Sequence, residues 1–363
     1  MSPGIRDQID LALSVVDGRI AAVDIRPRTR PPLSRILAGK PAEKAVAALP
    51  RLFSLCAAAH QVAFLSALDA AYAREVASLT RQRRTRAVVA ERLAELLRGL
   101  LMPRLAQDRG AIVGLRKLLQ AAASLAADTA DGSRIETLSQ IKTALAALGL
   151  CLRPEEIVPE SPLASIVVAA NDRDWTHPML ADQGHLSAAD DPLIVTRLLD
   201  EGASFADRPD LSGRVPETGV WARHALRMTS VAASSGTPVE RLEAKVAEII
   251  ELVRWLENQQ DDNETRESGV VESYPLGRGR GAAAVECARG RLYHAVELDG
   301  AGQIVRSEFL APTEWNFHPR GPVARALTGA AASMHSRDAV EALVGAFDAC
   351  VGVRVELTEL ADA

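Results

Sequence analysis

The fold class is decided at Arg81–Leu101, which reads RQRRTRAVVAERLAELLRGLL. Apolar side chains recur there at the spacing of one helix face, at Val88, Leu93, Leu96, Leu97 and Leu100. Pro103 follows shortly afterwards and predicts the end of the helix. The four arginines at its start are most simply a solvated, partner-facing surface: Arg81, Arg83, Arg84 and Arg86.

Helical patterns continue on both sides of this stretch. Residues 51–77 are rich in Ala and Leu and contain neither Pro nor Gly, and residues 112–127, 135–148 and 217–234 are also helical in pattern. A further helix is predicted over 238–260, because Thr237-Pro238 is a good N-cap and first-turn pair. We therefore expect a helical body over 41–260, with an irregular insert over 153–214 that holds one short helix at 193–199.

The two ends of the chain have β patterns. Two β-favouring runs flank Asp17-Gly18, which predicts an N-terminal hairpin over 11–26. After Gly277 the apolar period becomes two, and short strands are expected within the C-terminal segment 277–353, at 283–286, 291–298 and 303–309. The sequence thus predicts one domain over 1–363, mainly α with a small antiparallel β portion (α+β) formed by the chain ends.

Composition excludes several classes of protein. The 363 residues are 48% hydrophobic, and 42 Lys and Arg against 47 Asp and Glu give a net charge of −5, which argues against a nucleic-acid binder. The longest apolar run, 144–152, is too short to span a membrane. Four widely spaced cysteines indicate reduced thiols. We expect a soluble, cytoplasmic protein with no nucleic-acid and no membrane partner.

Generic catalytic motifs do not explain the chain. The Gly-rich segment GRGRG at 277–281 lacks the Lys-Ser/Thr pair of a P-loop and is better interpreted as a flexible entry to the sheet. Cys56 and His60 stand four residues apart on a predicted helix, so both would project from one face. Taken alone, they are better interpreted as a small buried thiol beside a buried histidine than as a metal site.

Two segments resemble the cysteine signatures of the [NiFe]-hydrogenase large subunit. RLFSLCAAAH at 51–60 resembles R-x-C-x-x-C-x-x-x-H, with Phe53 in place of the first cysteine. FDACVGV at 347–353 resembles F-D-P-C-x-x-C, with Val353 in place of the last cysteine. Each signature therefore keeps one cysteine, Cys56 in the first and Cys350 in the second.

Two further segments extend the resemblance. ECARG at 286–290 is similar to the family segment E-A-P-R-G, and APTEWN at 311–316, followed by Pro319-Arg320, is similar to V-P-T-T-W-N-x-x-P-R. All four segments occur in the family's order. The pattern looks like the hydrogenase accessory proteins of the HupK/HoxV type, and it implies a shortened [NiFe]-hydrogenase large-subunit-like fold.

The resemblance implies which metal ligands remain. In the large subunit, four cysteines hold nickel and iron, and the iron also carries two cyanides and a carbon monoxide. Cys56 corresponds to a bridging ligand and Cys350 to a nickel-terminal one, while Phe53 and Val353 substitute the other two. Because nickel prefers more sulfur than two thiolates, the site is expected to bind iron and not nickel.

The resemblance also implies a pocket for the diatomic ligands of the iron. Arg289 corresponds to the cyanide donor, Thr313 to the hydroxyl beside the other cyanide, and Pro312 to the neighbouring wall. His60 would hydrogen-bond a metal-binding thiolate and orient it. The proton-relaying glutamate of the family becomes Ser34, so the resemblance implies no hydrogenase activity and no catalytic residue.

A function follows from these implications. A protein of this kind would bind the Fe(CN)2CO unit transiently and pass it to the hydrogenase large-subunit precursor, and its other partners would be the maturation proteins that assemble that unit. The alternative is a metal-free mimic of the large subunit that acts as a chaperone or protects the assembly from oxygen.

Overall fold

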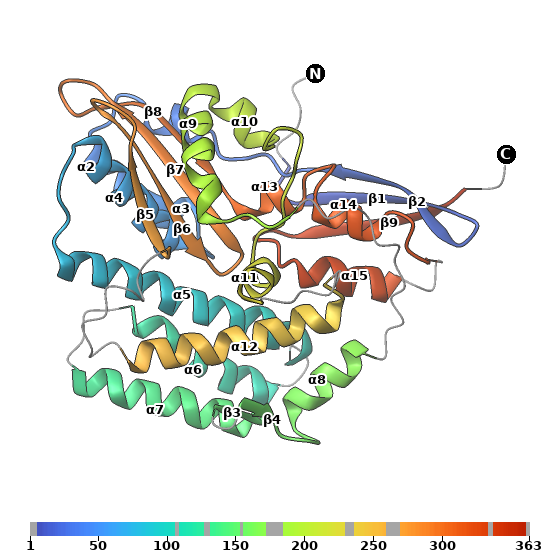
Figure 1. Ribbon diagram of the computed structural model, residues 1–363. Helices are drawn as coiled ribbons and strands as arrows, with labels where there is room; N and C mark the ends of the chain where they lie inside the picture. The colour runs from blue at the N-terminus through green and yellow to red at the C-terminus, as the bar shows by residue number, and fades with distance from the viewer. Residues whose placement is uncertain are drawn as a thin grey trace.

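The computed structural model describes residues 6–105, 109–126, 131–152, 155–171, 184–228, 236–258, 269–332 and 337–360. Helices form most of this part of the chain, and three small sheets complete it, so the predicted fold class is confirmed. Figure 1 shows a layer of long helices beneath a twisted sheet, with a second sheet at the side where the two chain ends lie. No helix within the described ranges is long and apolar enough to cross a membrane.

The helical layer is built around α5 (Ser78–Leu105) and α12 (Pro238–Glu257) (Figure 1). They pack with α6 (Arg109–Ser124) and α7 (Asp131–Ala147) around one apolar core. The predicted cap of α12 is confirmed, since Thr237 and Glu240 form a reciprocal capping box. The predicted stop at Pro103 was two residues early, because α5 continues to Leu105.

The helix predicted over 51–77 is interrupted. The structure has α3 (Leu49–Leu52) and α4 (Ala57–Ala71), and the chain leaves the helical conformation between them. Glu91 of α5 accepts hydrogen bonds from the backbone N–H groups of Ala58 and Ala59, at 2.7 and 2.9 Å. These bonds satisfy the free donors at the start of a helix and so fix a new N-terminus. Cys56 is therefore the residue that precedes α4, not a residue within a longer helix.

The segment expected to be irregular, 153–214, contains much regular structure. Its described residues include β4 (Glu155–Ile157), paired with β3 (Leu150–Leu152), and the helices α8 (Pro162–Asn171), η1 (Ala188–Asp190), α9 (Asp191–Glu201) and α10 (Ala203–Asp207). The short helix predicted at 193–199 is confirmed as part of α9. The helix predicted over 217–234 is shorter, α11 (Val220–Arg227), and residues 229–235 lie outside the described residues.

The four-stranded antiparallel sheet lies between helices on both faces. Its order is β5 (Val271–Pro275), β6 (Arg280–Cys287), β7 (Gly290–Leu298), β8 (Ile304–Leu310), and β5 was not predicted. Helix α4 covers one face and α9 the other (Figure 1). Small side chains permit the close approach: a Cβ at Gly281 would lie 2.3 Å from the backbone nitrogen of Ala71 in α4. The sheet is therefore a rigid, buried support.

The chain ends meet in a second sheet, of order β2-β1-β9. β1 (Ile9–Val16) and β2 (Arg19–Arg26) form a hairpin, and positive φ angles of 50° at Asp17 and 69° at Gly18 make its tight turn. β9 (Val353–Glu359) runs parallel to β1, so this sheet is mixed, not antiparallel as expected for the chain ends. Two strands can pair in parallel only when the chain between them is long enough to return to the same end of the sheet. Here 336 residues separate the two strands.

Short helices complete the structure. α1 (Leu33–Leu37) and α2 (Ala42–Val46) follow the N-terminal hairpin, and α13 (Pro312–Asn316), α14 (Pro322–Leu327) and α15 (Arg337–Ala346) precede β9. α14 and α15 place Val323, Leu327, Val340 and Leu343 in the core beneath the mixed sheet. Together these elements carry the loops around 28, 312 and 350 toward the β6–β7 turn.

Candidate functional site

A cavity of about 200 Å³ brings together segments that are far apart in the sequence. We call it the site cavity. Its walls come from the α3–α4 connection, the β6–β7 turn, the start of α13 and the loop before β9. Of the residues singled out from the sequence, seven line it: Phe53, Cys56, His60, Arg289, Pro312, Thr313 and Cys350. Val353 does not, because it is the first residue of β9 and pairs with Ile9.

Arg289 connects a thiol to two acidic side chains. Its Nη1 donates to Cys56 Sγ at 3.3 Å, and its Nη2 donates to Glu95 Oε2 at 3.1 Å. The same nitrogen lies 3.7 Å from Asp348 Oδ1. Burial opposes the guanidinium charge, but Asp348, Cys56 and Glu95 together raise the pKa of Arg289 above its usual range. The cavity therefore holds a permanent positive charge next to a sulfur atom.

Cys287 is a cavity residue whose role the sequence left open. It ends β6 and lines the site cavity together with Cys56. Interaction with the Cys287 thiol, reinforced by burial, raises the pKa of Cys56, and the same interaction lowers the pKa of Cys287. The only signal in the sequence was its place two residues before Arg289. All four cysteines are free thiols.

Cys350 faces the start of α13. Its Sγ lies 3.2 Å from Thr313 Oγ1, within hydrogen-bonding distance, and Pro312 occupies the first helical turn beside it. Burial raises the pKa of Cys350, whereas the positive charge of Arg28 acts in the opposite direction. The hydroxyl and the thiol that the motifs singled out are thus direct neighbours.

His60 has a different partner from the one expected. We expected it to hydrogen-bond a thiolate, but its Nδ1 forms a 2.8 Å hydrogen bond with Nε2 of His294. Its ring also stacks on Phe53, with 3.5 Å between centroids and 4° between planes. Burial, aided by His294 and Arg28, lowers the pKa of His60. Phe53 thus supplies a stacking surface at the position where the large-subunit signature has a cysteine.

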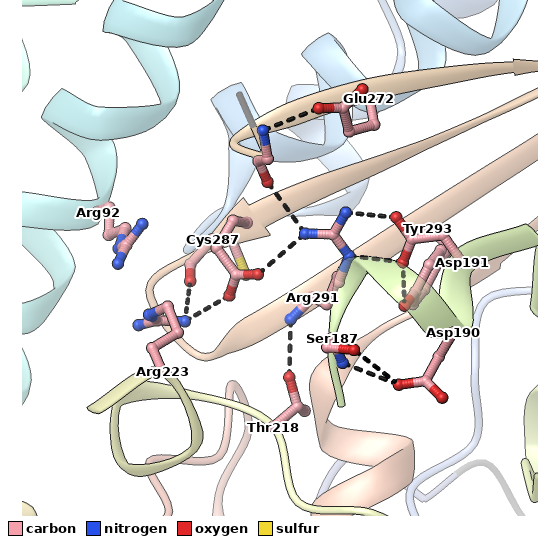
Figure 2. A network of polar contacts seen from close by, with 12 residues as sticks. Arg92, Ser187, Asp190, Asp191, Thr218, Arg223, Glu272, Cys287, Arg291 and Tyr293 are labelled. Atoms are coloured by element: carbon pink, nitrogen blue, oxygen red, sulfur yellow. Dashed lines mark hydrogen bonds and ion pairs between the residues drawn. The ribbon is translucent and has the colours of Figure 1, made fainter. Parts of the chain in front are cut away.

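A polar network fixes the turn that carries Cys287 and Arg289 (Figure 2). Arg223 donates to the carbonyl oxygens of Cys287 and Ala288, at 3.2 and 3.0 Å. It also forms a 2.5 Å ion pair with Glu286, near the end of β6. Because the arginine binds both main chain and side chain, the turn has one well-defined position.

Behind the turn, Arg291 anchors β7 to helix α9. Its Nε donates to Asp191 Oδ1 at 2.6 Å, and its backbone N–H donates to Thr218 Oγ1 at 2.9 Å (Figure 2). Tyr293 donates to the same Asp191 oxygen at 2.9 Å. Asp191 has no exposed surface, so its charge is compensated entirely within the protein.

Two acidic residues of α5 near the cavity were not found from the sequence, because their helical pattern is that of ordinary surface positions. Glu95 binds Arg289, and Glu91 binds the first turn of α4. Burial raises the pKa of Glu91 to about 7. Ser34, which stands at the family's relay position, lies in α1 and donates to the carbonyl oxygen of Ser307 at 2.8 Å, and it does not line the site cavity.

Comparison with known proteins identifies full-length relatives. The hydrogenase expression/formation protein HupK of Bradyrhizobium diazoefficiens is 48% identical and covers 99% of both chains. HupK of Rhizobium leguminosarum bv. viciae is 32% identical over 97% of this chain and 98% of its own. HoxV of Cupriavidus necator is 30% identical over 91% and 92%. No profile of a protein family matches the chain.

Solved structures show the same fold. The Ni-Fe-Se hydrogenase of D. vulgaris Hildenborough superposes with a TM-score of 0.65 at 14% identity, over 93% of this chain and 94% of the other. An NAD+-reducing [NiFe]-hydrogenase gives a TM-score of 0.60 at 16% identity, over 92% and 93%. The chain thus shares its fold with the hydrogenase large subunit, and its sequence is similar to those of HupK and HoxV along nearly its whole length. The chain belongs to the HupK/HoxV family of hydrogenase expression/formation proteins.

Proposed function

We propose that this protein is a scaffold in hydrogenase maturation. It binds the Fe(CN)2CO unit in the site cavity through Cys56 and Cys350 and transfers it to the hydrogenase large-subunit precursor. One observation carries the proposal: four segments from distant parts of the sequence place both thiols, a cyanide-type donor and a hydroxyl around one cavity of about 200 Å³. A surface mimic of the large subunit would have no need of this internal arrangement.

The chemistry of the cavity suits an iron unit of this kind. The iron brings two cyanides and a carbon monoxide, so it needs few ligands from the protein. This is consistent with the finding that, among the described residues, no three His, Cys, Asp or Glu side chains form a group able to hold a bare metal ion. Arg289 and Thr313 can donate to cyanide nitrogens, and Pro312 and Leu292 provide apolar wall for the carbon monoxide.

A role in hydrogen turnover is not part of the proposal. At the two positions where the large-subunit signatures have cysteine, the ring of Phe53 stacks on His60, and Val353 belongs to a strand outside the cavity. Nickel would then lack two of the four thiolates of the large-subunit signatures, although Cys287 adds a third thiol to the cavity. A site that holds the iron unit with two sulfurs is also suited to release it, as a transfer protein must.

The partners follow from the names of the relatives, which are hydrogenase expression/formation proteins. We infer that this chain receives the iron unit from the maturation proteins that assemble it and delivers it to the large-subunit precursor. We place this step in the cytoplasm, because free thiols at Cys56, Cys287 and Cys350 require a reducing compartment.

Infrared spectroscopy tests the proposal. Purified after co-expression with the hydrogenase maturation proteins, the wild-type protein is expected to show cyanide and carbonyl stretching bands. Cys56→Ala and Cys350→Ala should each abolish these bands and lower the free energy of unfolding by only about 1 kcal/mol, because the cavity left by one sulfur is small.

Cys151→Ala is the matched control, since Cys151 lies in β3 and is not part of the site cavity. This variant should keep the bands at wild-type intensity. Wild-type protein without bands would favour the metal-free mimic that acts as a chaperone or oxygen-protection factor. Bands of normal intensity in both Cys56→Ala and Cys350→Ala would show that the ligand assignment is wrong.

A further inference from the structure

Arg28 is a second arginine at the site cavity. It lies in the loop between β2 and α1, outside every segment that resembles the large-subunit signatures. It lines the site cavity, and with Thr313 it also lines a neighbouring cavity of about 20 Å³. Its side chain is 14% exposed, so the guanidinium is largely removed from water. The two cavity arginines therefore come from different parts of the chain.

The polar atoms of the Arg28 side chain have few partners among the residues that the structure describes. Within the part of the chain that the structure describes, its one ion pair is with Glu314, at 3.7 Å, which is longer than a hydrogen bond. Glu314 is also 3.7 Å from Arg30, so it is shared between two cations. Arg28 Nε is buried and has no hydrogen-bond partner among the described residues. A buried donor of this kind is costly to maintain unless it serves a ligand.

Charge counting shows what such a ligand must be. Iron(II) with two cyanides is neutral, so binding to two thiolates gives a unit with a net charge of −2. Arg289 contacts Cys56 and pairs with Glu95 and Asp348, and these two carboxylates also pair with Arg98 and Lys245. The net charge of −2 exceeds the single positive charge of Arg289, and Arg28 is the other arginine on the cavity wall.

We infer that Arg28 is a second anion-binding residue of the site cavity and donates to a cyanide ligand of the iron unit. This inference rests on the proposed scaffold function. The guanidinium has a planar array of donors and stays charged at any working pH, which suits a cyanide nitrogen held in a fixed position. Arg28 and Arg289 would then hold the unit from two separate loops, which makes retention depend on both.

The test uses Arg28→Met in the full-length protein, co-expressed with the maturation proteins and examined by infrared spectroscopy. Loss of a hydrogen bond to a charged group should lower the amount of bound iron unit by about tenfold. The protein that remains loaded should show shifted cyanide bands, since cyanide stretching responds to a donor at its nitrogen. Arg28→Lys keeps the charge and should restore part of the occupancy, but not the wild-type band positions.

Arg26→Met is the matched control, because Arg26 is exposed at the end of the adjoining strand and its side chain pairs with the exposed Asp24. It should load as the wild type does. If Arg28→Met has wild-type occupancy and wild-type cyanide bands, the inference is overturned and the scaffold function stands. If the wild-type protein itself shows no bands, both the scaffold function and the role of Arg28 are wrong. Should Arg28→Met not fold, unchanged occupancy and bands in Arg28→Lys overturn the inference.

Discussion

At the scale of single residues, Glu91 links the fold to the site. Its carboxylate accepts two backbone N–H groups from the first turn of α4, directly after Cys56. Burial raises its pKa to about 7, these two hydrogen bonds act in the opposite direction, and the charge of Glu95 adds to the rise. The position of Cys56 thus depends on a carboxyl group that changes its protonation near neutral pH.

Glu91→Gln should change how stability depends on pH. Between the unfolded value near 4.5 and the folded value of about 7, the native state keeps a proton that the unfolded state has released. Stability from this group is therefore present at low pH and lost as pH rises to about 7, by up to about 1.4 kcal/mol per pH unit. The free energy of unfolding of Glu91→Gln minus that of the wild type should rise from pH 5 to pH 7 and then level off.

Urea denaturation at pH 5, 6, 7 and 8 measures this difference. A difference that is constant over the four pH values would show that Glu91 is not protonated in the native state at pH 5 to 6. Its main role would then be that of an ionised helix cap.

At the scale of elements, the β6–β7 turn decides where Cys287 and Arg289 point. Gly290 has a φ angle of 130°, which side-chain-bearing residues rarely adopt. A Cβ at this position would lie 2.3 Å from Thr218 Oγ1 and 2.8 Å from the backbone nitrogen of Gly219. The turn can therefore approach the segment before α11 only with glycine at position 290.

Gly290→Ala is expected to lower the free energy of unfolding by about 2 kcal/mol or more, because it adds backbone strain to a steric clash. The displaced turn should also weaken binding of the iron unit, since Arg289 is the residue before it. Gly300→Ala is the control, because a Cβ there meets nothing within 4 Å. Thermal unfolding and infrared intensity measure the two effects; equal values for both variants would contradict this role of the turn.

At the scale of the whole molecule, the site depends on the two chain ends meeting. Cys350 lies three residues before β9, and β9 is held by parallel pairing with β1. Val355 is buried in β9 opposite Leu11. The strand therefore anchors the loop that brings Cys350 to the cavity.

Val355→Asp should detach this strand, because it places an unpaired charge in an apolar core. We expect a loss of more than about 3 kcal/mol in stability and loss of iron-unit loading. Thr358→Asp adds the same charge at an exposed position of β9 and should leave both unchanged. Loading that persists in Val355→Asp would mean that β9 does not position Cys350.

Local sequence determined helices α5, α6, α7 and α12, the Asp17-Gly18 turn, the cap at Thr237 and strands β6, β7 and β8. These features follow from side-chain periodicity and from contacts between near neighbours, which a sequence displays directly. The motif segments also named most of the residues that line the site cavity.

Tertiary structure alone decided the rest. The break before α4 exists because Glu91, more than 30 residues away, binds its first N–H groups. Strand β9 pairs in parallel with β1, a strand from the other end of the chain. Cys287 and Arg28 enter the cavity through the same long-range packing. Such contacts depend on which distant surfaces meet. The local spacing of apolar residues does not indicate which distant segment will pack against them.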